Sequence, residues 1–242
     1  MSSFVTRVSD QASVYTLTQS EMENNATLIY NALSAKGWSL SAIAGALGNM
    51  QSESTLNPGA CEGGRGVPSG ASDKYAGGLG LIQWTDYPAY SGTYPNPVLW
   101  YAVQVSRNWY DGAVQCDLLN EADNPAITSC GAGQGARWGW QTSASYPSIG
   151  FAAYKAFNGT PEDAAEYFYF DMEWHYPVED GTLATRKQRA RAWYDFLGGT
   201  TPQPPDPPDP PDPPVPPVPT GKEKAWLYFK FDDLRKGNYE QI

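Results

Sequence analysis

The sequence predicts a mainly α-helical domain with a glycine-rich loop or small hairpin, followed by a proline-rich linker and a short tail. Apolar residues recur at three- and four-residue steps in several segments, which is the pattern of helices with one face in a core. Residues that typically begin and end helices bound these segments. Residues 54–82 lack this period and are rich in glycine and serine, which predicts turns. We therefore expect four parts: an arm over 1–19, the helical domain over 20–200, the linker over 201–219 and the tail over 220–242.

The first helix is predicted to follow a polar arm. Residues 1–19 are polar and mixed, so we expect them to be flexible or loosely packed. Ser20 and Glu23 have the spacing of a capping box at the start of the helix. Gly37 is placed to end it, because glycine readily adopts the left-handed conformation that follows many last turns. The predicted buried stripe is Met22, Ala26, Ile29 and Leu33.

A second helix is predicted from about Ser39 to Glu53, with an apolar stripe of Leu40, Ile43, Leu47 and Met50. Gly45 and Gly48 each cost this helix roughly 1 kcal/mol relative to alanine, so we expect a notch for a closely packed neighbour. Partial burial and the negative end of the helix dipole both disfavour an anion at Glu53. We therefore expect Glu53 to keep its proton near neutral pH. A neutral carboxyl is the group that protonates the leaving oxygen when a glycosidic bond is cleaved.

Five further helices are predicted in the rest of the domain. Their expected ranges are Pro97 to Trp109, Gln115 to Asp123, Ile149 to Phe157, Thr160 to about Trp174, and Leu183 to Leu197. Residues 124–147 are rich in glycine and serine and are predicted to be loop. In the last helix we expect Arg186, Lys187, Arg189 and Arg191 on the solvent face. Its predicted inner face is Ala190, Trp193, Tyr194 and Leu197.

Composition disfavours several classes of partner. The net charge of −10 argues against a nucleic-acid partner, which would require a basic stripe. The sequence has no apolar run of about eighteen residues, so we expect no membrane insertion. Residues 1–20 lack the apolar region of a secretory signal. If the protein works outside a cell, we therefore expect it to get there by a route other than general secretion.

The cysteines and the single histidine limit the chemistry further. The three cysteines, Cys61, Cys116 and Cys130, are too few and too scattered for a disulfide framework. The sequence fits either a single Cys116–Cys130 bridge or three reduced thiols. His175 is the only histidine, which excludes a zinc peptidase with two histidines on one helix. A catalytic pair of one of these cysteines with His175 remains an alternative. We expect no metal and no cofactor, and carboxylate chemistry fits the remaining residues best.

Residues 201–219 form a three-residue repeat of prolines that predicts a polyproline II rod. At ~3.1 Å per residue the rod would reach about 55–60 Å. Residues 220–242 are too few to hold a core of their own. The segment 225–231 has strand-like composition, so this tail is interpreted either as a docking strand or as the remnant of a second domain.

Two blocks of sequence resemble a known family. They are GNMQSES at 48–54 with LNP at 56–58, and GLIQWT at 80–85. Together they resemble the lysozyme domains of bacteriophage tail proteins, which are related to goose-type lysozymes and lytic transglycosylases. The resemblance covers about residues 20 to 198. It implies a lysozyme-like helical fold with a cleft, and cleavage between N-acetylmuramic acid and N-acetylglucosamine.

The resemblance also implies roles for individual residues. Glu53 would be the catalytic acid. Four residues would contact substrate: Gln83, Trp84, Asn57 and Gln51. Three acids in or beside the glycine-rich loop are candidates for a second carboxylate, and the sequence does not rank them: Glu62, Asp73 and Asp86. Glu173 is interpreted as a structural acid. Because related enzymes can work with one carboxylate, hydrolysis and anhydro-sugar formation both remain open.

The expected protein is therefore a muramidase at the tip of a phage tail, which opens the host wall from outside during infection. Its expected partners are peptidoglycan glycan strands and, through residues 220–242, other tail proteins. The alternatives are a lytic transglycosylase, an endolysin released at lysis, a non-catalytic wall-binding or structural tail module, and a cysteine–histidine amidase.

Overall fold

The computed structural model describes residues 3–69, 75–85, 96–130, 138–174 and 181–198. The chain divides into two units, residues 1–200 and 201–242, and every described residue belongs to the first. The described helices are α1 (Ala12–Tyr15), α2 (Gln19–Ser34), α3 (Leu40–Ser54), α4 (Pro97–Gln104), α5 (Gly112–Asn120), α6 (Pro125–Thr128), α7 (Phe151–Lys155), α8 (Pro161–Asp171) and α9 (Thr182–Phe196). The predicted mainly α-helical fold is confirmed. None of the helices in the described ranges has the length and hydropathy needed to cross a bilayer. The four predicted domain boundaries remain predictions.

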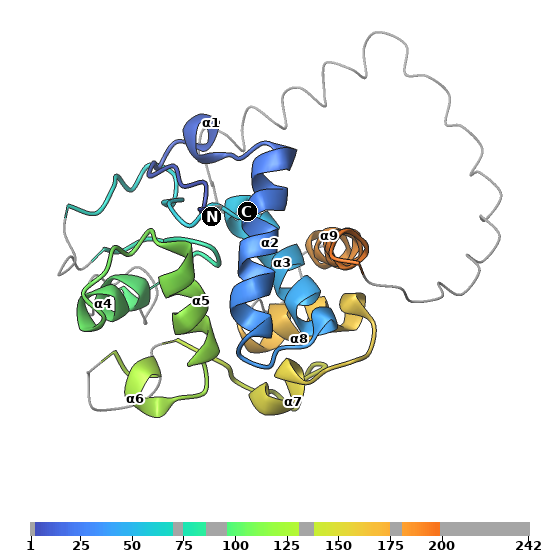
Figure 1. The fold of residues 1–242 in the computed structure, drawn as a ribbon. Helices are drawn as coiled ribbons and strands as arrows, with labels where there is room; N and C mark the ends of the chain where they lie inside the picture. The colour runs from blue at the N-terminus through green and yellow to red at the C-terminus, as the bar shows by residue number, and fades with distance from the viewer. Residues whose placement is uncertain (1–2, 70–74, 86–95, 131–137, 175–180, 199–242) are drawn as a thin grey trace, which may run out of the picture. The chain divides into compact units, whose positions relative to one another are not determined.

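Helix α3 is the centre of the first unit. Eleven of its 15 residues are buried. It packs against α2, α8 and α9, and α2 in turn contacts α5. Figure 1 shows α4, α5 and α6 on the far side of α2 from α8 and α9. A helix surrounded in this way is apolar on nearly all faces, as the sequence of α3 is.

The two glycines of α3 explain how closely its neighbours approach. A Cβ atom added at Gly45 would lie 2.6 Å from the backbone of Ala164 in α8. One added at Gly48 would lie 2.5 Å from the carbonyl oxygen of Arg186 in α9. The predicted packing notch is confirmed, because glycine at both positions lets two helices contact the α3 backbone.

Helix α2 begins two residues earlier than the sequence predicts. Thr18 is the N-cap: its hydroxyl accepts from the backbone N–H of Glu21, and the Glu21 carboxylate accepts from the Thr18 N–H at 2.8 Å. The prediction of a capping box at Ser20 and Glu23 was wrong. Both pairs have the same spacing, and only Thr18 has the extended backbone that an N-cap requires. Gly37 follows the last turn with φ of 84°, as predicted.

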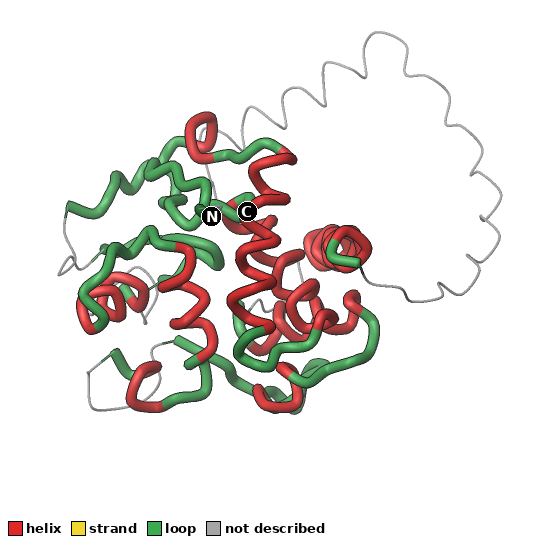
Figure 2. Tube along the Cα trace, viewed as in Figure 1, coloured by secondary structure: helices red, strands yellow, loops and turns green. Residues whose placement is uncertain are grey.

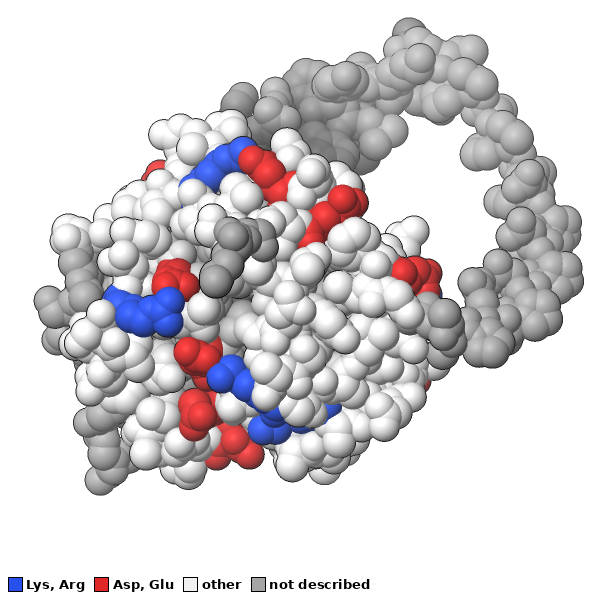
Figure 3. All heavy atoms as spheres, viewed as in Figure 1, with Lys and Arg blue, Asp and Glu red and all other residues white. Residues whose placement is uncertain are grey.

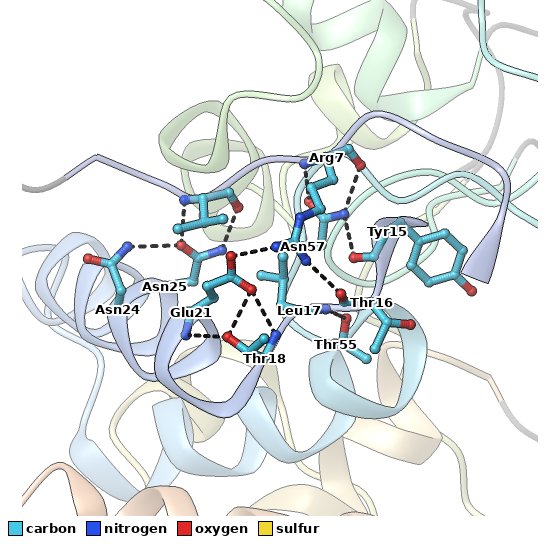
Figure 4. Close-up of polar contacts among 11 residues, drawn as sticks. Arg7, Tyr15, Thr16, Leu17, Thr18, Glu21, Asn24, Asn25, Thr55 and Asn57 are labelled. Atoms are coloured by element: carbon cyan, nitrogen blue, oxygen red, sulfur yellow. Dashed lines mark hydrogen bonds and ion pairs between the residues drawn. The ribbon is translucent and has the colours of Figure 1, made fainter. Parts of the chain in front are cut away.

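Residues 3–18 are packed against the domain, which differs from the loose arm that we predicted. The Asn25 side chain in α2 accepts from the Val5 N–H and donates to its carbonyl, both at 2.8 Å. Figure 4 shows the same arrangement around Asn57, which bonds both backbone polar groups of Arg7 and the carbonyl of Tyr15. Leu17 is buried. Sequence composition could not reveal this packing, because the partners are side chains of distant segments.

The glycine-rich region is joined by single bridges rather than regular strands. Ser9 pairs with Ala60, Cys61 pairs with Leu79, and Leu79 pairs with Trp84. Figure 2 accordingly draws the described part of this region as loop. The Ser54 hydroxyl donates to the Leu81 carbonyl at 2.9 Å, which fixes the turn at 79–84 against the last turn of α3.

The remaining elements differ from prediction mainly at their ends. Helix α4 ends at Gln104 instead of Trp109, and Ser106 then adopts a φ of 53° that turns the chain so that Trp109 packs into the core. Helix α6 lies inside the predicted loop 124–147. Its Asn124 cap and Pro125 are the same start signal as Thr160 and Pro161 of α8.

Candidate active site

Glu53 lies in the last turn of α3, at the surface end of a buried helix. Its side chain is 18% exposed. Met50 and Ser54, on either side of it in the helix, are almost completely buried. The Glu53 side chain is therefore held by the core and is still partly accessible from solvent.

Arg186 of α9 contacts this carboxyl, and its position corrects the prediction of a solvent-exposed basic face. The Arg186 side chain is only 4% exposed, and its Nη2 donates to Oε1 of Glu53. Its Nη1 donates to Oδ1 of Asn49 at 3.1 Å. Arg186 precedes the buried residues Ala190 and Trp193 by four and seven positions, so it belongs to their face of the helix.

Glu173, two residues after the end of α8, approaches the same guanidinium. Its Oε2 lies 3.7 Å from Nη1 of Arg186, and its side chain is 4% exposed. The ring of Tyr169 lies on another side, with its centroid 5.2 Å from the guanidinium carbon. Burial alone would lower the pKa of Arg186, but Glu173 and Glu53 outweigh it and raise the pKa. Arg186 is therefore a buried cation held between two carboxylates.

The guanidinium changes the expected protonation of Glu53. A guanidinium in contact with a carboxylate favours the charged form of that carboxylate. The helix end and partial burial favour the neutral form. The protonation of Glu53 thus depends on a balance between Arg186 and the rest of its surroundings.

Gln51 and Asn57 lie on either side of Glu53 in the sequence but have different surroundings. The Oε1 atom of Gln51 accepts from the indole N–H of Trp193 at 3.0 Å, and the residue is half-buried. Asn57 is completely buried, and its amide group is used by backbone groups of the N-terminal segment and Gly59. This placement favours a structural role for Asn57 over direct contact with substrate.

Gln83 and Trp84 lie in the turn that is fixed to α3. Gln83 has a φ of 52°, and its Nε2 donates to the Gly80 carbonyl at 3.0 Å. Gln83 is half-buried, so part of its side chain faces solvent. Trp84 is buried and its carbonyl accepts from Nδ2 of Asn96. The structure thus favours Gln83 over Trp84 as a substrate contact, and both remain predictions.

Of the three candidates for a second carboxylate, Glu62 alone lies within the described residues. Its Oε2 accepts from the Gly78 N–H at 2.9 Å, and its Oε1 lies 3.5 Å from Nε of Arg65. Asp73 and Asp86 lie outside the described residues. Glu173, which lies beside the Glu53–Arg186 pair, is too buried to activate a water molecule from solvent.

Cys61 and Cys116 have poor surroundings for nucleophilic chemistry. All three are buried, and Cys61 and Cys116 are free thiols, so the structure lacks the Cys116–Cys130 bridge. Burial raises the pKa of Cys61 and of Cys116 to about 12. Because the thiolate is the nucleophile, neither thiol is activated. His175 lies outside the described residues. Within the described ranges, no group of three or more histidine, cysteine or acidic side chains could hold a metal ion.

The other basic residues of α9 connect it to α8 and α3. Lys187 pairs with Glu166 at 2.6 Å, and Arg191 pairs with Glu162 at 2.7 Å. Arg189 donates to the Ser52 hydroxyl at 2.7 Å. On the face shown in Figure 3, basic and acidic side chains likewise lie close together instead of forming one basic field.

Sequence reasoning missed Arg186 and Asn49 as parts of this site. The available signal was helical phase: Asn49 is four residues before Glu53, so both lie on the same side of α3. For Arg186 the missing knowledge was which face of α9 meets α3.

Comparisons with known proteins identify the family of this chain. The family model described as phage tail lysozyme matches residues 24–197. A relative is the protein named Morphogenesis protein 1 of Bacillus phage B103, which is 43% identical over 74 residues. That match covers 31% of this chain and spans about a fifth of the relative's length (19%). Since the family model spans most of the chain and includes every described helix from α3 to α9, the chain belongs to the phage tail lysozyme family.

Proposed function

We propose that this protein is a peptidoglycan hydrolase that cleaves the β-1,4 bond between N-acetylmuramic acid and N-acetylglucosamine. The observation that carries the proposal is the Glu53 carboxyl, partly exposed at the end of the buried helix α3 and held by Arg186. In a member of the phage tail lysozyme family, such a carboxyl is suited to general acid catalysis.

In the proposed reaction, Glu53 donates its proton to the glycosidic oxygen as the C1–O bond breaks. The sugar cation that develops at C1 is then captured by water, which gives hydrolysis, or by a hydroxyl of the same sugar, which gives an anhydro product. In either case the attacking hydroxyl group loses its proton to the Glu53 carboxylate, which restores the acid for the next cycle. Hydrolysis with a second carboxylate would employ Glu62, Asp73 or Asp86. Gln83 would bind an acetamido group of the substrate.

We further propose that the enzyme is a virion component at the tail tip that opens the host wall from outside. Membership of a tail lysozyme family and similarity to a phage protein named for morphogenesis support this place of action. Residues 220–242 would attach it to other tail proteins.

The first test is digestion of purified peptidoglycan followed by mass spectrometry of the soluble fragments. Products ending in reducing muramic acid would establish hydrolysis. Products ending in anhydro-muramic acid would establish a lytic transglycosylase. Free amino termini with intact glycan strands would contradict the proposal, and binding to walls without any released product would indicate a non-catalytic module.

The second test is Glu53→Gln. Glutamine can still accept the hydrogen bond from Arg186 but cannot donate a catalytic proton, so we expect at least about a 100-fold loss of wall clearing. Its thermal midpoint should stay close to that of the wild type. Glu166→Gln is the matched control, since it removes a carboxylate from an α8–α9 ion pair away from Glu53. A Glu53→Gln variant with wild-type activity would rule out the assignment.

A further inference from the structure

The cluster around Arg186 contains one buried cation and two carboxylates. Nη2 of Arg186 contacts Glu53, and its Nη1 faces Glu173. The side chains of Arg186 and Glu173 are equally buried, whereas Glu53 is the more exposed of the two acids. Protonation of one carboxyl would leave the cluster electrically neutral.

This cluster presents a conflict for a general acid. A proton donor must be neutral before the reaction, yet a guanidinium in contact favours the charged carboxylate. Arg186 by itself favours the ionised form of Glu53, which cannot donate a proton. A second negative charge beside Arg186 removes this conflict, because it offsets the field of the guanidinium at Glu53.

We propose that Glu173 is a positioning residue that offsets the charge of Arg186, so that Arg186 can hold the Glu53 carboxyl in place without keeping it ionised. This inference rests on the proposed function, in which Glu53 is the acid. Glu173 is the ion-pair partner because it shares the full burial of Arg186, where an unpaired charge is most costly. Glu53, with access to solvent, is the carboxyl that exchanges its proton.

Among the described residues, further groups beside the cluster come from α3, α8 and α9. Burial and the nearby charge of Arg186 lower the pKa of Arg189 in α9. Arg189 also donates to Ser52, the residue before Glu53, so it adds positive charge near the acid. Tyr169 of α8 contributes its ring and Asn49 of α3 its amide oxygen, and neither offsets a cation with a full charge. Glu173, 3.7 Å from Nη1 of Arg186, supplies a full negative charge that offsets these two cations at Glu53.

The same arrangement assists the reaction after the proton has left. Glu53 then carries a full negative charge, and the Arg186 contact stabilises it without any movement of the protein. Asn49 holds Nη1 while Nη2 holds Glu53, so the guanidinium plane is fixed from two sides. The Asn49 amide is fixed in turn by the carbonyls of Gly45 at 2.9 Å and Ala165 at 3.1 Å.

The test is the pH dependence of kcat/KM on soluble, uncrosslinked glycan strands for wild type and Glu173→Gln. Without the charge of Glu173, the field of Arg186 at Glu53 is stronger, so the alkaline limb of the profile should move down by about 1–3 pH units. At a fixed pH above the new limb, kcat/KM should fall about tenfold for each pH unit by which the limb has moved. KM should stay unchanged, because the buried Glu173 side chain is not accessible to substrate. The control is again Glu166→Gln, which removes an acid that pairs with α9 outside the cluster and should leave the limb in place. A limb that coincides in Glu173→Gln and wild type would overturn the inference.

A direct readout separates this inference from the proposed function. In protein labelled with ¹³C at glutamate carboxyls, the resonance lost in Glu53→Gln belongs to Glu53, and its titration midpoint can be followed without substrate. The midpoint should move to lower pH in Glu173→Gln and stay unchanged in Glu166→Gln. If wild type cleaves no glycan, the proposed function fails, and a midpoint that nevertheless moves would still support the charge compensation.

Arg186→Lys tests the positioning part. Lysine keeps the charge but cannot hold Glu53 and Asn49 from two separate nitrogens. The alkaline limb should stay near that of wild type, while kcat falls by up to about 100-fold because the acid is misplaced. An unchanged kcat in a variant that unfolds at the wild-type temperature would contradict the positioning role.

Discussion

At the scale of single residues, the site depends on a contact between residues 133 positions apart in the chain, Glu53 and Arg186. A buried ion pair of this kind contributes little net stability when intact, because desolvation offsets the attraction. Removing every partner of a buried charge is strongly destabilising, but in Glu53→Gln the guanidinium keeps Glu173 and Asn49 beside it. The pair is therefore better understood through its effect on proton transfer than as a source of stability.

Asp171 is a second buried acid, and it carries a prediction about pH and stability. It lies at the end of α8, where its carboxylate accepts from the Ser148 hydroxyl at 2.6 Å and the Ile149 N–H at 3.0 Å. Burial raises the pKa of Asp171, and these two hydrogen bonds oppose that rise only in part. The folded protein then binds more protons than the unfolded chain at pH values between the two pKa values. The free energy of unfolding should therefore decrease as pH rises through that window, which begins at about 4.

Replacing Asp171 with asparagine should remove this dependence. The difference in thermal midpoint, Asp171→Asn minus wild type, should become more positive between about pH 4 and pH 7, because only wild type bears the buried charge. Thermal unfolding at several pH values measures it. Asp195→Asn, at an exposed position of α9, is the control and should show no such trend. A difference that stays constant or becomes more negative would contradict the raised pKa.

At the scale of elements, the residues at helix ends determine more of the local structure than the residues inside the helices do. The N-terminus of α2 offered two pairs with capping box spacing, and the structure employs Thr18 and Glu21. This choice also fixes the N-terminal segment, because Glu21 pairs with Arg7 at 2.5 Å. Hydrogen bonds from the Thr18 backbone and side chain, together with Arg7, lower the pKa of Glu21.

The cap can be tested by two alanine substitutions. Thr18→Ala should lower the free energy of unfolding by about 1 kcal/mol, since the Glu21 N–H loses its acceptor. In a domain of this size that corresponds to a decrease of about 2–4 °C in the thermal midpoint. Ser20→Ala, at an exposed position inside α2, should change stability by less than about 0.5 kcal/mol. The reverse result would restore the capping box at Ser20 and Glu23.

At the scale of the whole molecule, the helical unit is expected to work independently of the proline-rich linker and the tail. The chain separates into residues 1–200 and 201–242, and the candidate site lies entirely in the first unit. The proline repeat of residues 201–219 predicts a stiff spacer, which would carry the enzyme away from its point of attachment.

A chain ending at Thr200 should therefore keep its wall-cleaving rate and its thermal midpoint while losing attachment to phage particles. Cleavage assays, thermal unfolding and co-sedimentation with particles would measure the three properties. A second chain lacking residues 220–242 alone separates the tail from the spacer and should lose attachment equally. Attachment that survives both truncations would contradict the docking role of the tail.

Much of the fold could be predicted from the sequence because helices leave local signals. The apolar stripes of α2 and α3, the Thr160–Pro161 start of α8 and the glycine notch in α3 all depend on residues within a few positions of one another. The position of Glu53 at a helix end is equally local. The family resemblance came from two short blocks and is confirmed by the family model.

The sequence alone thus determined that the chain forms a helical domain with an acid at the end of its central helix. Only the tertiary structure decided that Arg186 is buried against that acid, that Glu173 joins them, and that Asn57 fastens the N-terminal segment. The physical reason is that a basic side chain on a helix is compatible with either solvent or a buried partner. Which of the two occurs depends on the surface that α3 and α8 present to α9, and that surface exists only after the helices have packed.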